Sequence, residues 1–236
     1  MNSVLSPFQQ HRERIRMMVQ NKTSTLVDAP SSVHILNIEL EQDIDFLRKN
    51  FVNTEDRIEY KRTVLLPKWQ PKADQYLKEG KIYQNSIFVH CIIWLFDTEQ
   101  FDLAIEWALV GIDQNQDTPR NFKSRLSTFV ADTVFDWCEK SMTNGESIEP
   151  YFSQVFELIK NKWRLHEEIS AKWYKLAGLN ALLDDNGKVQ PISAIGDITK
   201  LEQVKELFTT ANNFYSKIGV GTRIKEIESR INALNK

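Results

Sequence analysis

The sequence predicts an all-α fold, arranged as a multi-helix array of orthogonal and antiparallel helices. Glycine and proline are scarce, with 8 Gly and 7 Pro in 236 residues, so few positions interrupt a helix. No alternation of apolar and polar residues runs longer than a few positions, as a half-buried strand would need. Apolar residues instead recur every three or four positions. We therefore expect helices almost throughout.

Composition narrows the class of protein. The formal net charge is -2, so any binding to nucleic acid must depend on local basic patches. The two cysteines, Cys91 and Cys138, are far apart and form no CxxC pair, which predicts a reducing compartment without disulfides or a thiolate zinc site. The longest apolar run is too short to cross a bilayer. These features predict a soluble cytoplasmic protein without a membrane partner.

Residues 1–30 form a predicted basic N-terminal arm or helix. Ser6 and Pro7 are typical of a helix start. The basic residues that follow could contact DNA, and these candidates are Arg12, Arg14, Arg16 and Lys22. A solvated helix or a frayed terminus is the alternative interpretation.

Residues 31–183 are predicted to form the central helical core. A helix over residues 33–51 has apolar residues spaced by three and four, which indicates a helical partner, either within the chain or in a second copy. The next helix begins at Thr54 with acids in its first turn. We expect it to end before Pro67, because proline disrupts a helix. Pro67, Trp69 and Pro71 then form a rigid corner, with Trp69 packed in the core.

The most apolar part of the chain lies within residues 61–109, the predicted structural hub. Short helices are expected over residues 72–79 and 86–96, and a return helix over residues 99–111, forming an antiparallel hairpin around Trp94 and Asp97. Residues 97–117 contain six acids and no basic side chain, and Arg120, Lys123 and Arg125 follow directly. This polarity could match a neighbouring subunit or balance within the fold.

The second half of the chain continues the helical pattern. Helices are predicted near residues 123–142, 150–163 and 165–183. A connector rich in Gly and Pro, residues 184–198, marks the start of a C-terminal helical subdomain, residues 184–236. Its helices are predicted over residues 199–218 and 221–234. Together with the helix before the connector, they have the rhythm of small and aromatic residues seen in tetratricopeptide-like helix pairs, which predicts such a pair. No 34-residue period repeats along the chain, so we do not expect a solenoid.

Motifs for catalysis are sparse. No GxxxxGK[ST], GxGxxG or GxSxG sequence occurs, and the four histidines are scattered, so we expect neither ATP hydrolysis nor a cofactor. The weak catalytic candidates are Asp56, Glu59 and Lys61, an acid-x-Lys pattern that could serve a Mg²⁺-dependent nuclease. Surface pairs on a helix explain the same pattern more simply. No metal is expected unless this nuclease site exists.

Two strings, KRTVLLPKWQPKADQYLKEG and IIWLFDTEQFDLAIEWAL, resemble the small terminase subunit of temperate contractile-tailed bacteriophages. The opening SPFQQHRERI and the C-terminal KWYKLAGL and YSKIGVGTRIKEIESRI are also similar to that family. No glycine ends the family's LWxxDxG pattern here, since Glu99 and Gln100 follow Thr98, and the basic tail of many relatives does not follow Lys236. The resemblance then implies that the N-terminal arginines or a face with Arg57, Lys61 and Arg62 hold DNA.

The resemblance implies a role in viral DNA packaging, in the cytoplasm of an infected bacterial host. Such a subunit binds double-stranded viral DNA as a ring-like homo-oligomer and delivers it to the large terminase subunit, an ATPase and nuclease. Two alternatives remain. The chain could be a Mg²⁺-dependent endonuclease subunit, or a helical adaptor that binds only protein through the acidic residues 97–117.

Overall fold

The computed structural model describes residues 30–184 and 187–236. Within them almost every element is helical, and one isolated bridge, between Leu183 and Val189, is the only extended pairing. The all-α prediction is therefore confirmed. The tetratricopeptide-like pairing stays a prediction. The predicted N-terminal arm, with Arg12, Arg14, Arg16 and Lys22, lies outside the described residues.

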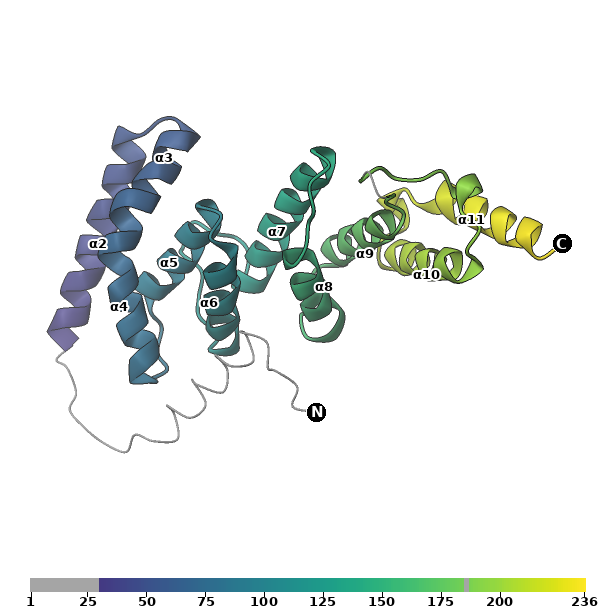
Figure 1. Ribbon diagram of the computed structural model, residues 1–236. Coiled ribbons are helices and arrows are strands. Elements are labelled where there is room, and N and C mark those ends of the chain that lie inside the picture. The colour runs from purple at the N-terminus through teal and green to yellow at the C-terminus, as the bar shows by residue number, and fades with distance from the viewer. Residues whose placement is uncertain (1–29, 185–186) are drawn as a thin grey trace, which may run out of the picture. The chain divides into compact units, whose positions relative to one another are not determined.

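The chain divides into two compact units after Leu126. The predicted boundary near residue 184 lies between two helices inside the second unit. The first unit begins with α2 (Pro30–Asn50), which lies alongside the helices that follow it (Figure 1). Leu40 and Leu47 of α2 are buried, so the predicted three-and-four spacing does pack within the chain.

The next helices form one continuous segment. They are α3 (Thr54–Tyr60), a π-helical turn (Lys61–Leu65) and α4 (Leu66–Glu79). Glu55 and Asp56 lie in the first turn of α3, as predicted. α4 ends at Gly80, whose φ of 66° is left-handed and suits glycine because it has no Cβ.

The predicted corner at Pro67, Trp69 and Pro71 is wrong, because the helix continues through all three residues. In the π turn, the amide of Leu66 donates to the carbonyl of Lys61, five residues back. This wider turn adds a residue directly before Pro67, which enters at the first turn of α4, where a proline is tolerated. Pro71 lies inside α4. Burial of Trp69 on the same helix offsets the hydrogen bond that Pro71 cannot make.

The helices α5 (Ser86–Asp97) and α6 (Phe101–Asp113) form the predicted hairpin at the centre of the first unit. The side chain of Asn85 accepts a hydrogen bond from the amide of Phe88 and so caps α5. Nine of the twelve residues of α5 are buried, as expected of a helix that is apolar nearly all round.

The second unit contains α7 (Leu126–Thr143), α8 (Tyr151–Asn161), α9 (Glu167–Ala181), α10 (Ile198–Phe214) and α11 (Gly221–Leu234). Two short 3₁₀ turns, Ile192–Ala194 and Ser216–Ile218, flank α10. A Cβ on Gly178 would lie 2.4 Å from the ring of Phe208, so α9 and α10 pack closely at this glycine. In the described part of the chain, no helix is both long and apolar enough to cross a membrane.

Candidate nucleic-acid interface

Lys61 of the predicted basic face makes an ion pair within the fold. Its Nζ lies 2.7 Å from Oδ2 of Asp97, at the end of α5, and the Lys61 side chain is only 16% exposed. The pair joins the π turn to the central hairpin. The ammonium group of Lys61 is therefore already paired with a carboxylate and is not free to bind a phosphate.

The two arginines of the same face also have partners. Arg57 Nε donates to the carbonyl of Phe51 at 2.8 Å. Arg62 Nη1 donates to Glu59 at 2.9 Å, and its Nη2 lies 3.4 Å from the carbonyl of Thr98. Since each cation is neutralised or hydrogen-bonded locally, this face offers little free positive charge.

The three weak nuclease candidates bind three different partners. Asp56 accepts a hydrogen bond from Asn53, Glu59 pairs with Arg62, and Lys61 pairs with Asp97. Nuclease metal sites need several carboxylates directed at one ion. Across residues 30–184 and 187–236, no three His, Cys, Asp or Glu side chains gather as a metal site. The structure does not bring these residues together as a reactive group.

Trp69 of the hub is fully buried, and its indole Nε1 donates to Asp43 of α2 at 2.8 Å. Lys68 Nζ lies 2.7 Å from the same carboxylate and 2.9 Å from Glu39. Burial disfavours the charged amine, but the hydrogen bonds to Asp43 and Glu39 outweigh it and raise the pKa of Lys68. These contacts attach α4 to α2.

A buried amide holds the loop after α6. Gln116 is 6% exposed, and its Nε2 donates to the hydroxyl of Tyr76 at 2.8 Å and to the carbonyl of Tyr83 at 2.7 Å. Its Oε1 accepts from the amide of Asn85 at 2.8 Å. A fully hydrogen-bonded buried amide fixes the backbone around it. The segment that follows therefore starts from a rigid base.

That segment, the loop between α6 and α7, exposes Arg120, Lys123 and Arg125. Among the described residues none of the three has an ion-pair partner. The hydroxyl of Thr118 donates to the carbonyl of Ser124 at 2.8 Å, which closes the loop on itself. Unpaired, exposed cations on a fixed loop are suited to phosphate contacts.

A run without acids around the three basic residues could have identified this loop from the sequence. The acidic residues just before it made the charge of the region look balanced. From the sequence, the three cations next to the acidic residues 97–117 could match a neighbouring subunit or balance the charge within the fold. However, residues 118–131 contain no acid, and Asp117, the one acid of the loop, makes no ion pair with the three cations in the described structure. Residues 118–131 also contain several bases, whereas acids and bases are interspersed in residues 55–62.

A polar cavity of about 640 Å³ lies beside the loop, between α2 and the start of α5. Arg48, His90 and Arg120 line it. Nδ1 of His90 is 2.7 Å from the carbonyl of Ser86, so this nitrogen must carry the proton. Burial, together with the charge of Arg48, outweighs that hydrogen bond and the charge of Glu41 and lowers the pKa of His90. The cavity thus contains a neutral histidine, two arginines and three carboxylates, Glu41, Asp45 and Asp117.

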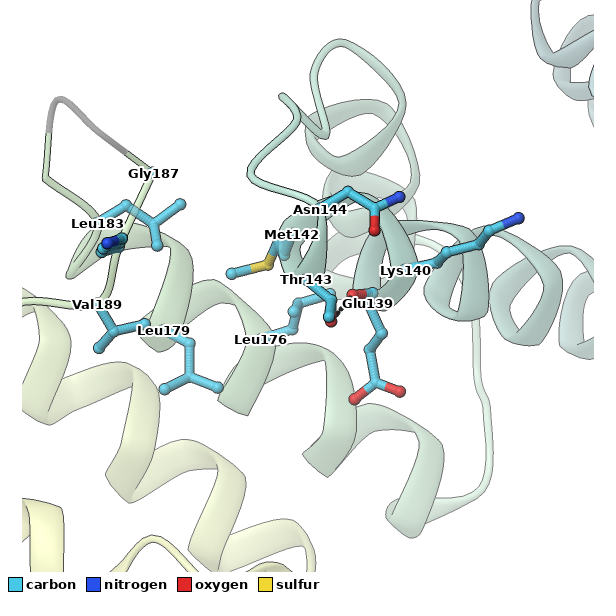
Figure 2. Close-up of a pocket in the computed structure, with 11 residues that line it drawn as sticks. Glu139, Lys140, Met142, Thr143, Asn144, Leu176, Leu179, Leu183, Gly187 and Val189 are labelled. Atoms are coloured by element: carbon cyan, nitrogen blue, oxygen red, sulfur yellow. Dashed lines mark hydrogen bonds between the residues drawn. The ribbon is translucent and has the colours of Figure 1, made fainter.

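The second unit has a cavity of about 670 Å³ between α7, α9 and the connector (Figure 2). Leu176, Leu179, Leu183 and Val189 form its apolar wall. The side chain of Lys140 points away from the cavity (Figure 2). Glu139, Lys140 and Lys188 also line this cavity, so its rim is charged although its wall is apolar.

A family comparison identifies the chain. The model of the family described as phage small terminase subunit matches residues 37–168. The chain belongs to the phage small terminase subunit family. The matched residues include the hub, the loop of Arg120 and the face of Arg57, Lys61 and Arg62, which we call the paired face because each of the three has a partner within the fold. The family resemblance expected from LLPKWQP and WLFDT is therefore confirmed.

Two curated relatives of this small terminase subunit are similar over most of its length. A protein of Haemophilus phage HP1, named "Probable terminase, endonuclease subunit", is 41% identical over 202 residues, covering 86% of this chain and 71% of the relative. The "Terminase, endonuclease subunit" of Escherichia phage P2 is 24% identical over 229 residues, covering 96% and 85%. No solved structure matches the chain significantly.

Proposed function

We propose that this small terminase subunit acts in viral DNA packaging. It binds double-stranded viral DNA as a ring-like homo-oligomer and presents the DNA to the large terminase subunit, in the cytoplasm of the infected bacterial host. Membership of the family supports this role most strongly, because the family match covers residues 37–168. No cofactor is needed for recognition and assembly.

The loop between α6 and α7 is the proposed DNA contact of the described residues. Arg120, Lys123 and Arg125 are exposed and lack ion-pair partners there. Contacts between such cations and phosphates release counterions, so each contact makes the affinity more dependent on salt. The predicted N-terminal cations could add to this surface.

A binding titration tests the proposal. We expect the full chain to bind a labelled duplex from the phage genome, with an affinity that falls steeply between about 50 and about 200 mM salt. Fluorescence anisotropy measures the affinity, and sedimentation of the same samples measures the subunit number. Absent or salt-insensitive binding would contradict the DNA role, and binding to the large subunit alone would indicate a protein adaptor.

A second candidate function is DNA cleavage, favoured by the names of the two relatives, both of which contain "endonuclease subunit". In this alternative the chain is a Mg²⁺-dependent endonuclease subunit that uses Asp56, Glu59 and Lys61. Incubation of supercoiled plasmid with the purified chain and Mg²⁺, without the large subunit, tests it. Nicking that disappears in Glu59→Ala and remains in the Glu55→Ala control supports this site. Nicking unchanged in Glu59→Ala removes it.

A further inference from the structure

Helix α2 has a second apolar face that the described fold leaves uncovered. One face packs inside the first unit through Leu40 and Leu47, which are 1% and 7% exposed. The other carries Ile35, Ile38 and Phe46, which are 62%, 44% and 48% exposed. A soluble helix normally has one apolar stripe. A helix with two such stripes needs a partner on each.

The uncovered face extends onto the neighbouring helix. The ring of Phe46 lies 5.7 Å from that of Tyr60 on α3, and Val64, one turn later, is 40% exposed. We define the outer face as Ile35, Ile38, Gln42, Phe46 and Val64. Clustered exposed apolar side chains of this kind mark an interaction site, whereas Val189 of the second unit lines its cavity and Phe214 packs on Tyr174.

We infer that the outer face binds the same face of a second copy of this chain, with the two α2 helices antiparallel. The inference rests on the proposed homo-oligomer and identifies one of its interfaces. Ile38 and Phe46 lie four residues on either side of Gln42. A two-fold axis at Gln42 therefore places Ile38 against Phe46 of the second copy.

The same axis pairs the other exposed residues of α2. Glu39 meets Asp45 of the second copy, and in each copy Lys68 lies beside Glu39 while Arg48 and Lys49 lie near Asp45. Gln42 meets its own copy, and two facing amides can hydrogen-bond to each other. Ile35 meets the aliphatic stem of Lys49, whose charged end remains in water. A two-fold contact requires this self-complementarity, because the same patch serves both copies.

The available area suits a weak contact that acts with others in an oligomer. The paired part of α2, residues 35–49, extends for about 22 Å, and a face two helices wide covers roughly 400–450 Å². Pairing two such faces removes roughly 800–900 Å² from water, which is the size of a weak or transient interface. A two-fold contact closes at two copies. A ring built from these dimers therefore contains an even number of subunits.

A single engineered cysteine tests the contact in the full chain. The two native cysteines, Cys91 and Cys138, are fully buried, and burial raises the pKa of Cys138 to about 12 and that of Cys91 further, so both stay inert thiols. Under mild oxidation, Gln42→Cys is expected to give a covalent dimer on a non-reducing gel. Glu41→Cys, exposed on another side of the same helix, is the matched control and should remain uncrosslinked.

Charge on the outer face provides the second measurement. Ile38→Asp and Phe46→Asp are expected to weaken self-association about 100-fold, measured by sedimentation, while Val189→Asp in the second unit leaves it unchanged. Because both substituted side chains are already partly exposed, the variants should keep the helical circular dichroism of the parent chain.

The outcomes separate this inference from the proposed function. An oligomer that gives no disulfide in the Gln42→Cys variant and resists both aspartates overturns the outer-face contact but leaves the packaging role intact. A parent chain that stays monomeric overturns both the contact and the homo-oligomer, and DNA binding is then judged by anisotropy. Variants that keep their mass but lose the large subunit would assign the face to that partner and refute self-pairing.

Discussion

Two segments of the first unit each carry three basic residues within six positions, and the fold treats them differently. Arg57, Lys61 and Arg62 lie on a helical segment where each has an intramolecular partner. Arg120, Lys123 and Arg125 lie on a loop and have no ion-pair partner among the described residues. Equal local charge therefore gives a structural contact in one segment and a free electrostatic surface in the other.

Helical periodicity explains the contrast. Residues three apart on a helix are neighbours, so Glu59 reaches Arg62. The π turn also directs Lys61 toward the end of α5, where Asp97 lies. The loop has neither a helical neighbour of opposite charge nor an acid within residues 118–131. Free positive charge is thus more readily found by locating acid-free runs than by counting bases.

The largest expected effect is the loss of DNA affinity when the loop cations are removed. An unchanged affinity would contradict the difference between the two basic segments. Replacing all three loop cations, Arg120→Ser, Lys123→Ser and Arg125→Ser, should lower the affinity for duplex DNA roughly 100-fold at physiological salt. Loss of three phosphate contacts should also reduce the slope of log K against log salt by about 2.7. Anisotropy titrations at several salt concentrations measure both quantities.

The matched control for the loop is the paired face. Arg57→Ser with Arg62→Ser removes two cations of similar sequence spacing, and the DNA affinity should change by less than about threefold. A larger loss in this control than in the loop variant would reverse the assignment of the two segments.

The next largest effect concerns how the helical segment is anchored. Trp69→Phe removes the indole donor to Asp43 and leaves space in the core, and it should lower the free energy of unfolding by about 2 kcal/mol. Chemical denaturation measures this loss, with Trp137→Phe, a half-buried site in the second unit, as the comparison. DNA affinity of folded Trp69→Phe should be unchanged.

A smaller loss is expected from the ion pair of the paired face. Lys61→Met leaves the Asp97 carboxylate, 33% exposed, without its cation and should cost about 1 kcal/mol of unfolding free energy. Asp97→Asn should cost a similar amount, and the double variant less than the sum of the two. Strict additivity in this cycle would mean that the pair contributes nothing.

The pH dependence of stability tests the environment of His90, which lines the cavity between α2 and α5. Burial lowers the pKa of His90, so the unfolded chain takes up a proton more readily than the folded one. This contribution is fully present above about pH 6.5 and is lost as the pH falls through the lower, folded pKa. Thermal melts between about pH 8 and pH 5 should therefore decline less steeply in His90→Gln than in the parent chain.

The smallest effect is expected at the exposed ion pair. The side chains of Arg62 and Glu59 are 48% and 60% exposed, so Arg62→Ser should change the free energy of unfolding by less than about 0.5 kcal/mol. Chemical denaturation of this variant beside Lys61→Met would show whether exposure, rather than charge, separates the two pairs.

Several helices and their ends were predictable because the local chemistry was unambiguous. Thr54 and Ser86 begin helices, Gly80 ends one, and residues 221–234 form the last helix as predicted. The site was less predictable. Whether Lys61 meets a phosphate or Asp97 depends on a residue 36 positions away, and no local pattern encodes that distance.

The LLPKWQP segment separates what the sequence determined from what the tertiary structure decided. The all-α class followed from the scarcity of Gly and Pro along the whole chain, while the residues of this segment determined the family resemblance and the need to bury Trp69. They did not determine the path of the backbone, since two prolines locally favour a break. The π turn before Pro67, with burial of Trp69 against Asp43, keeps the helix continuous, because contacts between distant residues outweigh the local preference for a break.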